Sequence, residues 1–391
     1  MNNLVLISVS FTINFLLNGL SYVLVVRSLS DYELSNYLRI MAIIPVLAIL
    51  SNSYQQVVSH SHIDQEKIKK SKYMLLTFKK SLPFSLLVLF GLFAVNEQIK
   101  LTSNFGILLV CLYLPLTYAI SSLLGILQRE KENISWQIST TLESLLRLTF
   151  VLFFANYFAN DLAMFSAILI SVSIVILIQL FKIRKDKFVT HKDISNSSTL
   201  PTLKLFAFAL LVQSDVILGA VYLEQDEALN YILISNLVKL IYGVLYIYSQ
   251  MSFSGSQSRL ENKFSGFSNP NKMIPSLGIF VLVIFYILNK NIDLIIEKVL
   301  NRSFDLNPTL LSILLIATFT FAFSVLNTLQ SVKGKTLLMP ITAVSFTLFA
   351  VSAKNFATNS IEYAQCYLAG AIVYGLLLAV AQIKNRPEKR M

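Results

Sequence analysis

Long apolar stretches separated by short polar segments dominate this chain. A helix needs about 20 apolar residues to cross the hydrocarbon core of a bilayer. Twelve stretches approach this length, at about residues 3–26, 35–58, 74–95, 104–127, 137–156, 162–181, 203–223, 229–252, 273–289, 309–330, 336–353 and 361–383. The pattern predicts an all-α polytopic membrane protein with about 12 transmembrane helices. Lys79, Lys80 and Pro83 interrupt the third stretch, but lysine side chains can extend from a span to the membrane interface.

The composition supports this prediction. Hydrophobic residues make up 55% of the 391 residues, charged residues only 14%, and the mean hydropathy is +0.66. Soluble domains carry about 25% charged residues, so this chain lacks the charge to cover a water-exposed surface. Cys111 and Cys366 lie inside apolar stretches, and the three histidines do not gather with them. A disulfide scaffold and a zinc site are therefore excluded, and no metal or cofactor is expected.

Lysine and arginine residues are distributed unevenly between the two sides of the predicted helices. Of the 32 basic residues, 23 fall in the C-terminal segment and the loops on its side, and six fall in the opposite loops. The positive-inside rule places both termini of a multi-pass protein in the cytoplasm. The basic loops face an anionic leaflet, so anionic membrane lipids are expected partners. The net charge of +11 therefore requires no nucleic-acid partner.

An internal repeat lies close to half the chain length. Residues 29–40 read LSDYELSNYLRI and residues 223–234 read LEQDEALNYILI, with five identities at a constant offset of 194. Both copies lead from an outer loop into an even-numbered helix. The repeat predicts two six-helix lobes, 1–195 and 196–391, in the same orientation. Transporters with parallel repeats hold substrate between the repeats, so a central cavity is expected.

Apart from the residues near span ends, five ionisable residues lie inside the predicted spans, where each charge costs at least about 2.5 kcal/mol unless it is paired or faces a cavity. They are Arg39, Glu143, Arg147, Asp215 and Lys239. Glu143 lies four residues before Arg147, so these two side chains can neutralise each other. Asp215 and Lys239 lie on adjacent predicted helices and can also form a salt bridge. Either pair can therefore be a structural strut or part of a substrate site.

Small polar side chains line other helix faces. Asn14 and Asn18 share a face with Ser21 on the first helix, and Asn327 shares one with Ser324 on the tenth. Such residues also hold helices together in membrane bundles. Together with the buried cations, they predict a hydrated, mildly positive cavity. Its predicted substrate-binding residues are Asn14, Asn18, Arg39, Glu143, Arg147, Asp215, Lys239 and Asn327.

Residues 14–37, NFLLNGLSYVLVVRSLSDYELSNY, resemble the start of Wzx-type polysaccharide flippases. These belong to the multidrug/oligosaccharidyl-lipid/polysaccharide exporter superfamily. The family pattern of an Asn-containing helix and an R-x-L-(G/S)-x-x-E-(Y/F)-G-x-Y turn is matched at Arg27, Leu29, Ser30, Glu33 and Tyr37. Leu34 and Ser35 replace the usual aromatic residue and glycine.

Residues 212–231, VQSDVILGAVYLEQDEALNY, resemble the D-x-x-x-G helix and E-x-x-x-Y turn of the same family. Asp215, Gly219, Glu227 and Tyr231 match, and Leu229 replaces a glycine. The resemblance implies a transporter that moves undecaprenyl-diphosphate-linked oligosaccharide from the cytoplasmic to the outer leaflet of the bacterial inner membrane, for O-antigen or capsule synthesis. It also implies a polymerase and a chain-length regulator of the same pathway as partners.

Two other function classes stay open at this stage. A cation-coupled drug or metabolite antiporter of related fold is the first, although an anionic cavity would be expected for cationic drugs. A membrane glycosyltransferase or polymerase is the second, although the outer loops are short and no DxD motif faces the cytoplasm. The sequence has no Ser-His-Asp, paired-carboxylate or P-loop arrangement, so the chain is not expected to be an enzyme.

Overall fold

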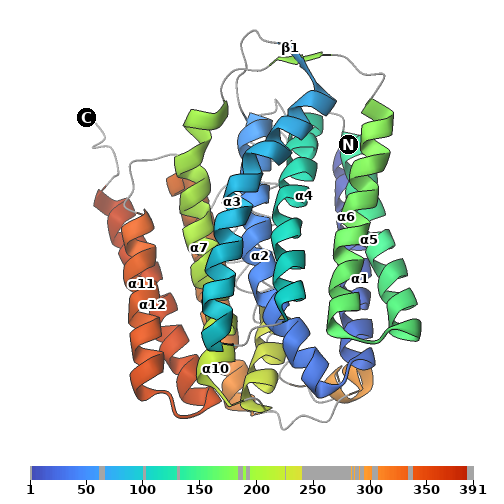
Figure 1. Cartoon of the computed structure of the whole chain (residues 1–391). Helices are drawn as coiled ribbons and strands as arrows, with labels where there is room; N and C mark the ends of the chain where they lie inside the picture. The colour runs from blue at the N-terminus through green and yellow to red at the C-terminus, as the bar shows by residue number, and fades with distance from the viewer. Residues whose placement is uncertain are drawn as a thin grey trace. The chain divides into compact units, whose positions relative to one another are not determined.

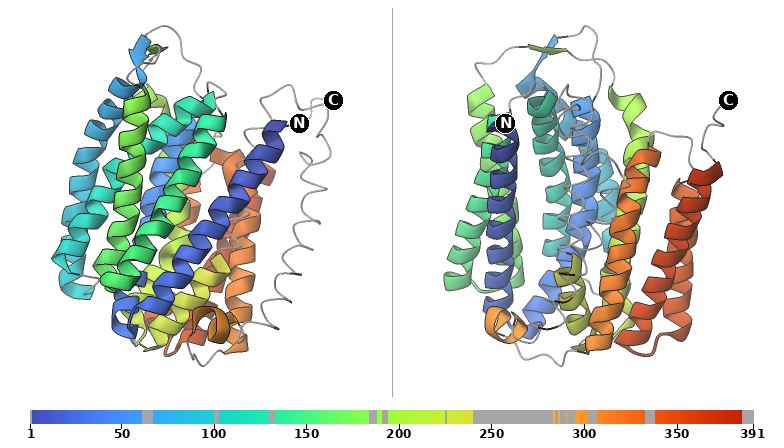
Figure 2. Two further views of the ribbon diagram at one scale, coloured as in Figure 1. Left: turned by 90° about the vertical axis from the view of Figure 1, so that its right-hand side faces the viewer. Right: turned by 180° about the vertical axis from the view of Figure 1, so that it is seen from behind.

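A computed structural model gives the fold of the chain (Figures 1 and 2). It describes residues 2–60, 67–99, 103–129, 133–183, 188–190, 194–224, 226–239, 283, 286, 290, 295–301, 307–332 and 338–384. The chain divides into two compact units, Met1–Phe206 and Ala207–Met391. The predicted lobe limits 1–195 and 196–391, and the cavity expected between the lobes, stay predictions.

Unit 1 consists of helices that follow the apolar stretches of the sequence. They are α1 (Asn2–Ser28), α2 (Asp31–His60), α3 (Lys70–Ile99), α4 (Asn104–Arg129), α5 (Asn133–Tyr157) and α6 (Asp161–Ile183). The central helix is α4, because it packs against α2, α3 and α6. Helix α1 lies along α5 (Figure 2). The core joins Ile40 and Leu47 of α2 to Leu114 of α4 and Phe165 of α6.

Unit 2 is also helical. Helix α7 (Ile194–Tyr222) crosses from unit 1 into unit 2, and residues 226–239 are helical as well. A π-helical segment, η2 (Ile295–Leu300), precedes α10 (Pro308–Val332), α11 (Leu338–Phe356) and α12 (Ser360–Lys384). Helix α12 packs against both α10 and α11. Much of the ninth predicted helix lies outside the described residues.

Polar residues placed just before the apolar stretches define where several helices begin. Ser30 and Glu33 form a capping box at the start of α2, in which the Glu33 backbone N–H donates to Ser30 Oγ at 3.3 Å. Asn160 caps α6 through the Ala163 N–H at 2.8 Å, and Asn359 caps α12. These side chains accept hydrogen bonds from N–H groups that have no partner inside the helix.

The all-α polytopic fold is confirmed. Within the described ranges, five helices are long and apolar enough to cross a membrane, by length and composition. These stretches are Met74–Ala94, Asn104–Leu127, Ile134–Tyr157, Asp161–Lys182 and Ser360–Ala381. The sequence did not predict the short antiparallel pair of β1 (Lys67–Lys69) and β2 (Phe188–Thr190), which joins two basic loops. This pair lies at the same end of unit 1 as the start of α1 (Figure 1).

The predicted orientation can be tested with reporter fusions. Alkaline phosphatase is active only outside the cytoplasm. Fusion after Ser195, at the start of α7, should give low activity, because the basic residues predict that this end is cytoplasmic. Fusion after Glu227, one span later, should give high activity. The reverse pattern would overturn the assignment of both termini to the cytoplasm.

Gly370 allows α12 to approach α11 closely. A Cβ atom at this position would lie 3.0 Å from Phe349 Cβ and 3.2 Å from the Ser345 carbonyl oxygen. We expect Gly370→Val to lower the free energy of unfolding by about 1–3 kcal/mol, the usual range for overpacking. Thermal unfolding in detergent measures this loss. Gly91→Val on α3 is the control, because an added Cβ there meets no atom of the described structure within 4 Å. Equal losses in the two variants would contradict the packing argument.

Candidate functional site

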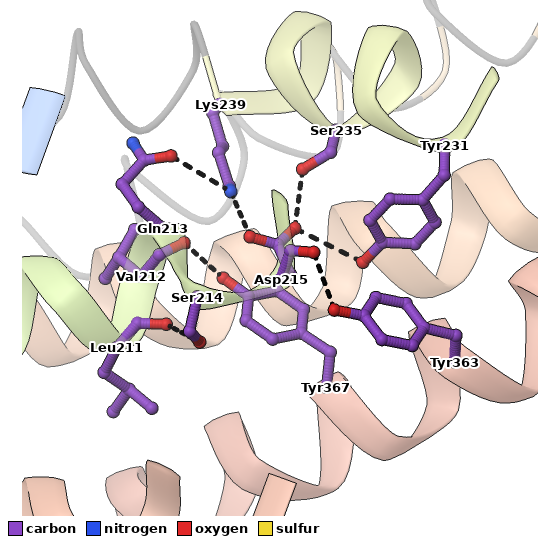
Figure 3. Close-up of polar contacts among 10 residues, drawn as sticks. All are labelled: Leu211, Val212, Gln213, Ser214, Asp215, Tyr231, Ser235, Lys239, Tyr363 and Tyr367. Carbon is purple, nitrogen blue, oxygen red and sulfur yellow. Dashed lines mark hydrogen bonds and ion pairs between the residues drawn. The ribbon is translucent and has the colours of Figure 1, made fainter. Parts of the chain in front are cut away.

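Unit 2 contains a buried ion pair between Asp215 of α7 and Lys239 of the helical residues 226–239. Lys239 Nζ donates to Asp215 Oδ1 and also to Gln213 Oε1 at 3.3 Å (Figure 3). The Asp215 side chain is fully buried, and only 7% of the Lys239 side chain is exposed. The charges therefore neutralise each other inside unit 2. This is the bridge that the sequence left open as an alternative.

The second carboxylate oxygen of Asp215 is also satisfied. Ser235 Oγ donates to Asp215 Oδ2 at 2.7 Å, and the Tyr231 hydroxyl lies 3.3 Å from the same atom. Tyr231, Ser235 and Lys239 are spaced four residues apart, so one face of their helix directs all three donors at a single carboxylate. This spacing is the sequence feature that could have identified Ser235 and Tyr231 as partners.

Two tyrosines of α12 bind the backbone of α7 beside this pair. Tyr363 donates to the Asp215 carbonyl and Tyr367 to the Val212 carbonyl, each at 2.7 Å (Figure 3). The Tyr231 and Tyr363 rings pack edge to face with centroids 5.0 Å apart. Lys239 Nζ lies 5.8 Å from the centroid of the Tyr367 ring. The aromatic side chains thus pack around the ion pair, and the two α12 tyrosines fix α7 against α12.

Unit 1 contains a different polar cluster, between α1 and α5. Three pairs of side chains connect the two helices: Ser10 with Thr141 at 2.9 Å, Asn14 with Thr140 at 3.3 Å and Asn18 with Ser144 at 3.3 Å. The residues on α1 recur every four positions and so share a face. We call this cluster, together with Glu143 and Arg147, the polar seam. Its side chains are partly buried.

Arg147 is the cation of the polar seam. Its Nη2 donates to Glu143 Oε1 at 2.6 Å, and its Nη1 donates to Asn18 Oδ1 at 3.2 Å. The Arg147 and Glu143 side chains are 23% and 21% exposed. Arg147 Nε and Asn14 Oδ1 are buried and make no hydrogen bond within the part of the chain that the structure describes. Arg147 therefore combines a partly exposed guanidinium group with one donor that has no partner in the described structure, whereas Lys239 is enclosed.

The structure thus gathers six of the eight predicted site residues into two groups. Asn14, Asn18, Glu143 and Arg147 meet in unit 1, and Asp215 and Lys239 meet in unit 2. Arg39 is half-buried on α2. The side chain of Asn327 lies outside the described residues. A substrate-binding role stays a prediction for all eight.

Several contacts of these groups were not predicted. Thr140 and Ser144 are hydroxyl residues of the kind found in many spans, and Tyr363 and Tyr367 are more than 140 positions from the carbonyl groups that they bind. Only the packing of the helices brings them together. Among the described residues, no group of three or more His, Cys, Asp or Glu side chains is placed to hold a metal ion.

Solved structures include relatives of this chain in fold. A multidrug resistance MATE family transporter of the MOP superfamily, in an inward-facing conformation, superposes with a TM-score of 0.62 and 12% identity over 96% of this chain and 97% of that one. A MATE protein in complex with MaD5 gives a TM-score of 0.57 and 13% identity, over 96% and 92% of the two chains. The chain has the fold of MATE transporters.

At these identities the MATE likeness establishes the fold and leaves the substrate open. No family model matches the sequence, and no curated protein does. The fold agrees with the superfamily that the first- and seventh-helix motifs resemble.

Proposed function

We propose that this protein is a membrane transporter that flips polyprenyl-diphosphate-linked oligosaccharide from the cytoplasmic to the outer leaflet. The MATE fold supports a transporter, and the motifs around Arg27 and Asp215 resemble those of polysaccharide flippases. The observation that carries the proposal is Arg147, a partly exposed cation with an unused N–H in a polar seam. A diphosphate head group needs such a cation to leave the aqueous interface, because an anion in hydrocarbon is costly without a partner.

The rest of the polar seam suits the sugars of the proposed substrate. Its hydroxyl and amide groups belong to Ser10, Asn14, Asn18, Thr140, Thr141 and Ser144, and each can both accept and donate hydrogen bonds. Sugar hydroxyl groups have the same capacity and can replace these contacts one for one. The lipid tail would stay in the bilayer while the head group crosses.

A cation-coupled drug antiporter is the second candidate, because the solved relatives in fold include a multidrug resistance transporter. Such a protein needs a carboxylate that is available to a cationic drug. Here the two carboxylates inside the spans, Glu143 and Asp215, are each bound to a cation of the chain. This charge balance favours an anionic substrate.

Reconstituted protein can separate the two candidates. Proteoliposomes that contain a polyprenyl-diphosphate-linked oligosaccharide report flipping when the sugar becomes accessible to an added glycosidase. A parallel assay follows uptake of the cationic dye ethidium against a pH or sodium gradient. We expect protein-dependent flipping of the lipid-linked sugar and no dye transport. Dye transport without flipping would replace the proposed function with the antiporter.

A further inference from the structure

The outward face of α3 combines apolar side chains with two lysines. Leu75, Leu82, Leu86 and Phe90 follow a helical spacing on this face and are between 39% and 69% exposed. In an apolar 18-residue stretch within Met74–Ala94 of α3, only 17% is buried, compared with 72% for the corresponding stretch of α4. In a membrane, this face of α3 lies against acyl chains, since it is apolar and is not covered by protein.

Lys79 and Lys80 are exposed within the same face. Lys79 lies four residues after Leu75 and three before Leu82, on the apolar stripe itself. Neither ammonium group has a hydrogen-bond or ion-pair partner in the described part of the protein, unlike Arg147 and Lys239. A charged side chain at this position is costly in hydrocarbon, so it must reach the interface or bind an anion there.

The direction of α3 determines which interface the lysines reach. Side chains on a helix lean toward its N-terminus, and α3 begins at Lys70, directly after β1. The pairing of Lys69 with Phe188 joins this end to the loop after α6. The joined segments, 67–72 and 182–192, carry nine lysine and arginine residues in the sequence. Lys79 and Lys80 therefore extend toward the basic end of unit 1, which the sequence predicts to be cytoplasmic.

We propose that Lys79 and Lys80 bind the phosphate head group of an anionic phospholipid of the cytoplasmic leaflet, whose acyl chains lie along Leu82, Leu86 and Phe90. The occupant must combine an anionic head with an apolar tail, because the cations are set in an apolar, span-length face. An acidic segment of a soluble protein lacks this tail. Helix α3 packs on α4, whereas the polar seam lies on α1 and α5. The lipid is therefore a resident ligand rather than the transported cargo, and this inference does not depend on the proposed function.

Native mass spectrometry of the purified full chain can measure this binding, with phosphatidylglycerol titrated into the detergent and phosphatidylcholine as the neutral comparison. Each cation near an anionic surface contributes about fivefold to binding. We expect Lys79→Gln/Lys80→Gln to bind phosphatidylglycerol about 30-fold more weakly, with phosphatidylcholine binding unchanged. Lys354→Gln is the matched control, because Lys354 is also exposed but lies at the predicted outer end of α11.

A variant that keeps both charges distinguishes a loss of lipid binding from misfolding. Lys79→Arg/Lys80→Arg keeps both charges and should retain the preference for phosphatidylglycerol. The proposal is overturned if this variant loses the preference, if the glutamine variant keeps it, or if the unaltered protein binds both lipids equally. Displacement of phosphatidylglycerol by an equal concentration of a polyprenyl diphosphate would also overturn it, because the occupant would then be the cargo lipid.

Discussion

Arg147→Ala is expected to lower flipping of the lipid-linked oligosaccharide by about 10- to 100-fold, the factor that corresponds to losing one hydrogen bond to a charged group. Arg147 is the partly exposed cation of the polar seam and has an N–H that makes no bond within the described structure. The amount of protein in the membrane should stay normal. Flipping in proteoliposomes, per molecule of purified protein, measures the effect.

A double variant separates binding from neutralisation at this position. Glu143→Gln alone should keep flipping, since Arg147 keeps its positive charge and no longer has a carboxylate that competes with the anion. Glu143→Gln/Arg147→Gln should stay as inactive as Arg147→Ala, because the anion has lost its partner. Recovery of flipping in the double variant would show that Arg147 serves only to neutralise Glu143. Thr149→Ala is the control, because Thr149 lies on the exposed side of α5 and donates only to the Leu145 carbonyl of its own helix.

The fold was largely predictable because membrane helices depend on runs of apolar residues. The stretch 162–181 became α6, Asp161–Ile183, and the stretch 361–383 became α12, Ser360–Lys384. The prediction was less accurate where a helix continues into polar sequence. Helix α7 begins at Ile194, nine residues before its apolar stretch, because residues such as Ser195 and Asn196 can be helical in water as well. Hydrophobicity alone cannot locate the first residue of a helix that begins in polar sequence.

The candidate site was predictable only where one helix supplies both partners. The ion pair of Glu143 with Arg147 follows from their spacing in α5 and is confirmed at 2.6 Å. The contact of Arg147 with Asn18 joins residues 129 positions apart, and it depends on the packing of α1 along α5. The resemblance to flippases included Asp215, Tyr231 and Gly219, but it did not predict that the first two bind each other. A contact between two helices depends on how the helices are aligned against each other, and a single sequence does not specify this alignment.

The two ion pairs differ in burial, and this difference predicts opposite roles. Glu143 and Arg147 keep about a fifth of their side-chain surface exposed, whereas Asp215 has none. Lys239 has two acceptors in Gln213 and Asp215, and the Tyr367 ring lies beside it. An anionic substrate could reach Lys239 only by breaking the bridge to Asp215. We therefore expect this pair to be a strut that fixes α7 against the helical residues 226–239.

The strut predicts that Asp215→Asn and Lys239→Gln each lower the free energy of unfolding by about 3–5 kcal/mol, because each leaves an uncompensated buried charge. The double variant Asp215→Asn/Lys239→Gln should recover most of this loss, since the cost of burying either charge disappears along with the attraction between them. Thermal unfolding in detergent measures all three variants. Flipping should recover in the double variant as well, in contrast to the inactive double variant at Glu143 and Arg147. A stable but inactive Asp215→Asn/Lys239→Gln protein would instead assign the pair a direct part in transport.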